Sequence, residues 1–92
     1  MGVPSWSFLT NHALALACIE RDPDARMRDI AECLGVTERA AHRIVSDLCE
    51  AGYVSKTRVG ARNRYTVDLD GDLRHPFLGG RPVRELIGAL ES

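Results

Sequence analysis

The residues of this sequence that are best suited to chemistry are basic and polar side chains at helical and strand spacing. Six polar residues between positions 37 and 46 fall on one side of a predicted helix: Thr37, Glu38, Arg39, His42, Arg43 and Ser46. A second group lies within 53–67, which holds four cations and no acid: Lys56, Arg58, Arg62 and Arg64. Basic side chains contact phosphates, and arginine reads guanine through two hydrogen bonds. The chemistry indicated is recognition of a nucleic acid.

Apolar and small residues predict the two helices that present the first group. Ile30 and Leu34 share one face of a short helix, which Gly35 ends in the left-handed conformation. Thr37 is a suitable N-cap for a second helix over 37–51, with an inward stripe at Ala41, Ile44, Val45 and Leu48. Two helices joined by a short glycine turn form a helix-turn-helix, although an ordinary αα-hairpin has the same pattern.

The second basic group predicts a β-hairpin directly after these helices. Gly52 ends the second helix and Gly60-Ala61 lies at the hairpin tip. A basic hairpin with a small apolar inner face suits phosphate contact, whereas a solvated edge hairpin is the alternative. Its place after a helix-turn-helix favours the first interpretation. We therefore expect phosphate or minor-groove contacts from Arg58, Arg62 and Arg64, with Asn63 assisting.

In this order the motifs resemble the winged helix-turn-helix regulators of bacteria and archaea, in the broad group with the MarR-like and ArsR-like families. The resemblance rests on 28–32, 34–37, 44–45 and the junction 48–54, with Leu48, Gly52, Tyr53 and Val54. It covers about 10–67. It implies that 37–51 is a recognition helix for the major groove, that 59–63 is the wing tip, and that 25–27 is a short strand pairing with the wing. The resemblance thus implies a sequence-specific regulator that binds double-stranded DNA.

The segments on either side complete one domain over 1–92. A first helix begins at Thr10 and ends at Asp22-Pro23, and its middle is apolar on every face. After a linker at 68–81, a helix at 82–91 carries an apolar stripe that packs on the first helix, either within one chain or across a twofold axis. We favour a homodimer, and expect Trp6 and Phe8 to join the same cluster. The predicted fold is mainly α with a small β-hairpin wing (α+β).

Composition agrees with a small globular domain. The chain has 92 residues and a net charge of −1, but five acids lie within 20–35 and three within 68–72. Positive charge is therefore concentrated on 37–67. No stretch approaches the roughly 18 apolar residues of a membrane span, and no secretory signal is visible. We expect a cytoplasmic, nucleoid-associated protein.

The three cysteines lie one in each of the first three predicted helices. An odd number without a secretion signal indicates reduced thiols: Cys18 as a core residue and Cys33 as the candidate for a redox switch, a role that stays open. No clustered Cys or His ligands of the ArsR-like metal sensors occur, so we expect neither metal nor cofactor. No catalytic motif indicates an enzyme. The alternative function is a winged-helix protein-interaction or assembly module, and any small-molecule effector is unknown.

Overall fold

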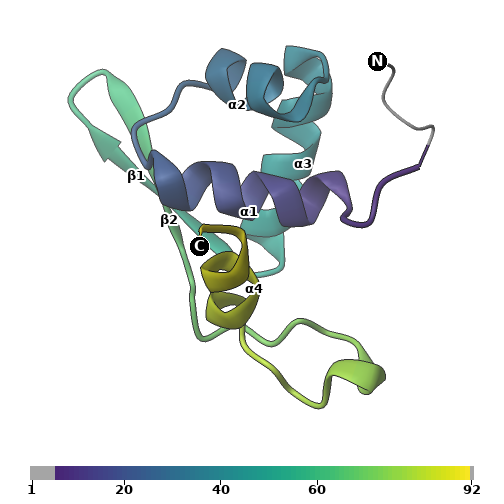
Figure 1. Cartoon of the computed structure of the whole chain (residues 1–92). Helices are drawn as coiled ribbons and strands as arrows, with labels where there is room; N and C mark the ends of the chain where they lie inside the picture. The colour runs from purple at the N-terminus through teal and green to yellow at the C-terminus, as the bar shows by residue number, and fades with distance from the viewer. Residues whose placement is uncertain (1–5, 92) are drawn as a thin grey trace.

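Three helices and a two-stranded hairpin form one side of the molecule, called the front, and a fourth helix lies below the first helix in Figure 1, on the side called the back. The computed structural model describes residues 6–91. Its elements are α1 (Asn11–Arg21), α2 (Met27–Leu34), α3 (Glu38–Glu50), β1 (Val54–Val59), β2 (Arg62–Val67), a 3-10 turn η1 (Pro76–Leu78) and α4 (Val83–Glu91). The predicted α+β winged helix-turn-helix fold is confirmed. No helix within 6–91 combines the length and apolarity needed to cross a bilayer.

The helix ends follow the local signals of the sequence. The Thr10 hydroxyl accepts a hydrogen bond from the backbone N–H of Ala13 at 3.2 Å, and Thr37 accepts one from Ala40 at 3.1 Å. Each satisfies an amide that the first turn of a helix leaves unpaired. Gly35 ends α2 with φ 72°, a conformation that residues with a Cβ rarely adopt. The turn between α2 and α3 is therefore built as predicted.

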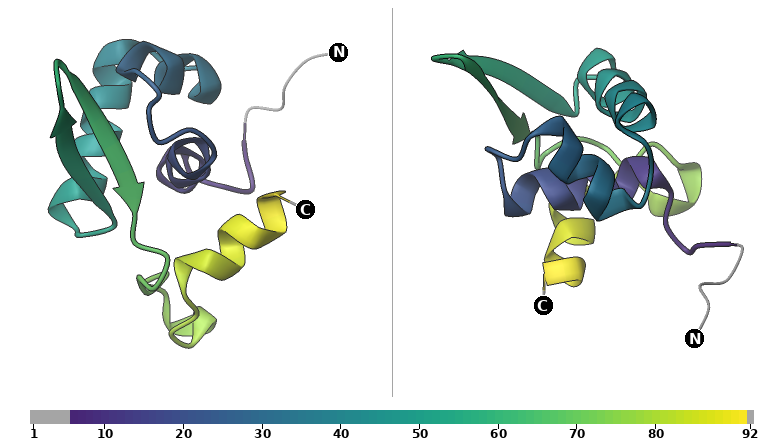
Figure 2. Two further views of the ribbon diagram at one scale, coloured as in Figure 1. Left: turned by 90° about the vertical axis from the view of Figure 1, so that its left-hand side faces the viewer. Right: turned by 90° about the horizontal axis from the view of Figure 1, so that it is seen from above.

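The core is a single apolar cluster with α1 at its centre. Figure 2 (left) looks nearly along α1 and shows the helix-turn-helix, the hairpin and α4 arranged around it. Within the described part of the chain every buried residue is apolar or Tyr65. The predicted inward stripe of α3 is buried: Ala41, Ile44, Val45 and Leu48. Burying that stripe leaves the opposite face of α3 in solvent.

The hairpin pairs two antiparallel strands from Val54 opposite Val67 to Val59 opposite Arg62. Gly60 has φ 63° at its tip. The predicted strand at 25–27 is wrong, because α2 already begins at Met27 and the sheet has two strands within residues 6–91. Two isolated hydrogen bonds take its place: the Tyr65 amide donates to the Pro23 carbonyl at 3.0 Å, and Arg62 donates to the Asp24 carbonyl at 2.8 Å.

The C-terminal helix packs on α1 within the same chain. Val83 and Ile87 of α4 are buried, and α4 contacts α1. The segment before it is more ordered than an irregular linker, since it contains η1 and an isolated bridge between Asp72 and Pro82. The expectation that Trp6 and Phe8 join this cluster is wrong. Their side chains contact each other edge to face but are 61% and 91% exposed.

The cysteines correct a further expectation. Cys18 of α1 and Cys33 of α2 form a disulfide, and Cys49 is free and half-buried. The prediction of three reduced thiols is therefore wrong for this structure, in which one pair is oxidised. It rested on cysteine count and spacing, whereas the two sulfurs meet because α2 folds back across α1, a contact that spacing along the chain does not reveal.

Candidate nucleic-acid interface

The outer face of α3 presents every polar residue selected there from the sequence. All six are exposed: Thr37, Glu38, Arg39, His42, Arg43 and Ser46. Thirteen residues make α3 about 20 Å long, and an α-helix of that kind fits the major groove of B-DNA. Arg39 and Arg43 are four residues apart and have no ion-pair partner within residues 6–91. Their guanidinium groups are free to bind a ligand.

The register of the hairpin decides which basic residues face α3. Residues paired across antiparallel strands share one face of the sheet. Lys56 pairs with the buried Tyr65 and Arg58 pairs with Asn63, so these residues lie on the α3 side. Arg62 and Arg64 are on the other face of the sheet by this register, but both side chains reach Asp24, and Arg62 also lines a hollow shared with His42. Lys56 is one of the four basic residues noted in the sequence, but it was not among those expected to contact phosphate; its place beside α3 follows from the register.

Two adjoining hollows connect α3 to the hairpin. Both are lined by Met27, His42 and Tyr65, one extending to Ser46 and Lys56 and the other to Arg62 and Asn63. Burial raises the pKa of the Tyr65 hydroxyl above its ordinary value of 10.0, so this group stays neutral at physiological pH. Residues of α3 and of the wing are thus brought into one continuous surface, with His42 at the junction.

Asp24 holds two of the wing arginines. Its carboxylate lies 3.5 Å from Arg64 Nε, and its carbonyl accepts the hydrogen bond from Arg62. Arg58 donates to the carbonyl of Gly60 at 3.3 Å, within the hairpin tip. The Arg64–Asp24 pair is exposed, and exposed ion pairs are worth about 0–1 kcal/mol. A phosphate can therefore replace Asp24 as the partner of Arg64 at little cost.

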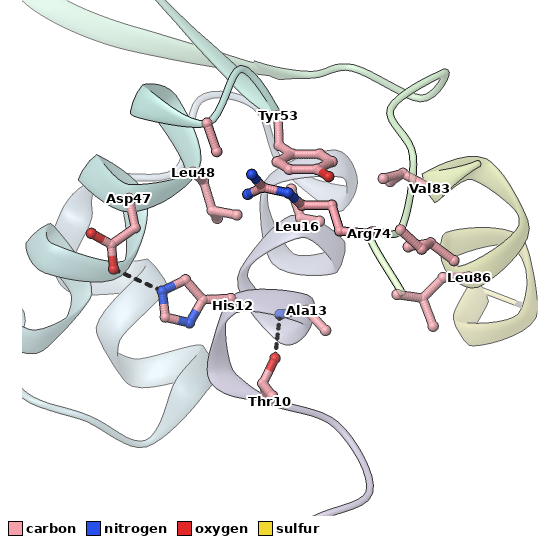
Figure 3. Close-up of a pocket in the computed structure, with 12 residues that line it drawn as sticks. Thr10, His12, Ala13, Leu16, Asp47, Leu48, Tyr53, Arg74, Val83 and Leu86 are labelled. Atoms are coloured by element: carbon pink, nitrogen blue, oxygen red, sulfur yellow. Dashed lines mark hydrogen bonds and ion pairs between the residues drawn. The ribbon is translucent and has the colours of Figure 1, made fainter. Parts of the chain in front are cut away.

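A pocket of about 380 Å³ lies between α1, the C-terminal half of α3 and α4 (Figure 3). At its edge His12 Nε2 lies 2.9 Å from Asp47 Oδ2. The guanidinium of Arg74 lies 5.7 Å from the centre of the Tyr53 ring, and the Tyr53 hydroxyl donates to the Asp72 carbonyl. Arg74 has φ 62°, a left-handed conformation, and its amide donates to the Asp72 carboxylate at 2.8 Å. These contacts fasten the segment before α4 to the end of α3.

Comparison with known proteins agrees with this geometry. The family model described as MarR family matches residues 7–64, which span α1, the helix-turn-helix and most of the hairpin. The chain belongs to the MarR family. No curated protein sequence matches this MarR-family chain.

One similar solved structure is the crystal structure of the zinc-dependent MarR family transcriptional regulator AdcR in the Zn(II)-bound state. It matches with a TM-score of 0.57 and 18% sequence identity, which supports the fold alone. The match covers 97% of this chain and 57% of that one, so this chain spans little more than half of that regulator. Among residues 6–91 no group of three or more His, Cys, Asp or Glu is placed to hold a metal ion.

Proposed function

We propose that this MarR-family protein is a sequence-specific regulator of transcription that binds double-stranded DNA through α3 and the wing. The observation that supports this most strongly is the joint surface of α3 and the hairpin. On it, Arg39 and Arg43 lack intramolecular ion pairs among the described residues, and Lys56 and Arg58 lie on the face of the wing that is turned toward α3. A protein-interaction module has no need for cations in this arrangement. The proposal describes a non-enzymatic protein that acts in the cytoplasm, with the nucleoid.

The two parts of the surface have different tasks. α3 enters the major groove, where Arg39 or Arg43 makes the paired hydrogen bonds to guanine. His42 and Ser46, farther along α3, lie at the hollows shared with the wing, and Thr37 and Glu38 lie at the N-terminal end near the phosphates. The wing follows the adjacent backbone or minor groove through Lys56, Arg58, Arg62, Asn63 and Arg64. Base contacts specify the site and phosphate contacts hold the protein on it.

The same proposal includes a homodimer that reads two half-sites. The support is apolar surface outside the core: the side chains of Trp6 and Phe8 before α1 and of Phe77 in η1 are exposed. A second copy of the chain seated there would place two recognition helices on opposite sides of a twofold axis. Half-sites related by such an axis lie one helical turn of DNA apart, or a multiple of it.

The experiment is the affinity for a random-sequence DNA duplex measured by fluorescence anisotropy from low to high salt. We expect binding at low salt that weakens steeply as salt rises, because bound cations release counterions from the DNA. The double variant Arg39→Ala/Arg43→Ala tests whether the outer face of α3 contributes to DNA affinity. The control is Arg81→Ala/Arg84→Ala, which removes the same charge from the opposite side of the molecule. Failure of the unmodified protein to bind at low salt would favour the protein-interaction module. Equal losses in the two double variants would show that net charge, and not this surface, controls binding.

A further inference from the structure

The disulfide between Cys18 and Cys33 lies outside the DNA-binding surface and joins the two helices that support it. Cys18 is in the last two turns of α1, and Cys33 is the penultimate residue of α2. Gly35, which opens the turn into α3, follows two residues later. The covalent bond therefore fixes α2 at the end where the chain turns toward the recognition helix.

Helix α2 is short and packs against both α1 and α3. It is eight residues long, and only Ile30 and Ala31 are buried, with Met27 and Leu34 partly so. Short helices are held mainly by the packing of their apolar face. A crosslink at its last turn adds a covalent constraint to this packing, at the end from which the chain turns into α3.

The sulfur pair is accessible from solvent. Cys33 is exposed and Cys18 is half-buried, and both line the groove that also contains Arg21 and Leu90. Exposed cysteines are the ones that peroxides and small thiols reach most readily. Small thiols and peroxides can reach this pair, unlike one enclosed in the core.

We propose that Cys18 and Cys33 form a reversible oxidation site, and that the disulfide form is the one that binds DNA tightly. This rests on the proposed function, because a DNA-binding regulator works in a reducing compartment, where disulfides are usually transient and redox-sensing. With the disulfide reduced, the end of α2 is released and the recognition helix loses part of its support.

The chemistry needs an organic or hydrogen peroxide as oxidant. The Cys33 thiolate attacks the peroxide, the O–O bond breaks, and a sulfenic acid forms with release of an alcohol or water. The Cys18 thiol then attacks the sulfenic sulfur, the S–S bond forms and water leaves. Two molecules of a small thiol reverse the reaction by exchange, regenerating both cysteines and leaving as their own disulfide.

The test uses the full chain with Cys49→Ser, which removes the third thiol and leaves the pair intact. Its affinity for a DNA duplex is measured after peroxide treatment and after reduction. We expect the oxidised form to bind roughly fivefold or more tightly, and its thermal midpoint to be higher by about 10 °C. Cys18→Ser and Cys33→Ser in the same background should each bind like the reduced form in both conditions. Circular dichroism checks that the Cys18→Ser and Cys33→Ser variants are folded. The comparison of the Cys49→Ser protein in its oxidised and reduced states holds even if these variants do not fold.

Thiol alkylation in cells, read by mass, tests reversibility separately. We expect both cysteines to be alkylated in untreated cells and protected after a peroxide pulse. If both cysteines were protected from alkylation in all conditions, the disulfide would be a static crosslink and the proposal would be overturned. If both were alkylated in all conditions, the disulfide would not form in cells and the proposal would also be overturned. Equal DNA affinities in the two states would overturn the coupling to DNA. Absence of DNA binding in both states, with reversible protection, would overturn the proposed function and the coupling while retaining the oxidation site.

Discussion

The arginines at the front and at the back of this molecule differ in what they contact. On the back, Arg81 lies 3.0 Å from Glu85 one helical turn away, and Arg84 pairs with Asp70. On α3, Arg39 and Arg43 have no ion-pair partner within the described residues. Arginine side chains therefore form ion pairs within the protein on the back, whereas those on α3 are available to bind a ligand. A net charge of −1 conceals this difference, because it averages over both sides.

The wing is intermediate between these two regions. Arg62 and Arg64 are exposed yet held by Asp24, so they are positioned before any DNA arrives. Preorganised side chains lose less conformational entropy on binding. Asp24 thus has two opposing effects on DNA binding, since it orients the wing and also places a negative charge beside it.

The largest expected effect separates the front from the back. Arg43→Ala should cost roughly 1–3 kcal/mol of binding free energy on a preferred sequence and relax selectivity at one base position, because a paired hydrogen bond to guanine is lost. Sequence selection with the variant, followed by affinity measurements, gives both numbers. Arg84→Ala is the matched control on the back, and it should leave affinity and sequence preference unchanged. An unchanged motif for Arg43→Ala would remove the base-reading role from this residue.

A substitution at the back should affect stability and leave recognition intact. A Cβ at Gly71 would lie 2.9 Å from two ring atoms of Tyr53, whose hydroxyl and ring face are both engaged. We expect Gly71→Ala to lower the free energy of unfolding by about 1–2 kcal/mol in a denaturant titration. Gly88→Ala, where a Cβ meets nothing within 4 Å, should raise it by up to about 1 kcal/mol. If Gly71→Ala were as stable as the parent, the close packing of Gly71 against the Tyr53 ring would be contradicted.

The wing arginines should affect affinity without selectivity. Arg62→Ala is expected to weaken binding about equally on all sequences and to reduce the slope of log affinity against log salt by about one. Affinities on a preferred and a random duplex at four salt concentrations measure this. A loss confined to the preferred duplex, with the slope unchanged, would contradict phosphate contact by the wing.

The smallest effect tests the opposing roles of Asp24. Asp24→Asn keeps the carbonyl that holds Arg62 but removes the charge, so affinity for any duplex should rise by about 0.5 kcal/mol at low salt. The gain should disappear at high salt, where charges are screened. Weaker binding would mean that orienting Arg64 matters more than the charge that Asp24 adds.

The features that could be predicted from the sequence are those encoded locally. The caps at Thr10 and Thr37, the left-handed Gly35 and the buried stripe of α3 all depend on neighbours within a turn or two. The exposed face of α3 followed directly, because burying one side of a helix fixes which residues remain outside. These local signals were sufficient to predict the fold and the α3 part of the candidate DNA-binding surface.

The features that were missed depend on contacts between distant segments. The Cys18–Cys33 disulfide requires α2 to fold across α1, and the orientation of Lys56 requires the hairpin register. Phe8 is exposed because the segment before α1 does not pack on the core cluster. None of these is determined by spacing along the chain, since each follows from how the elements pack.

The most direct test of the central claim is selection of bound sequences from a random pool of DNA duplexes, using the oxidised chain. If α3 reads bases from a homodimer, the selected pool will contain an inverted repeat whose half-sites are centred about 10–10.5 base pairs apart, or a multiple of that distance. Arg43→Ala will return the same repeat with one position relaxed. A pool that stays random after repeated rounds, or that is not retained at all, would contradict sequence-specific recognition by α3.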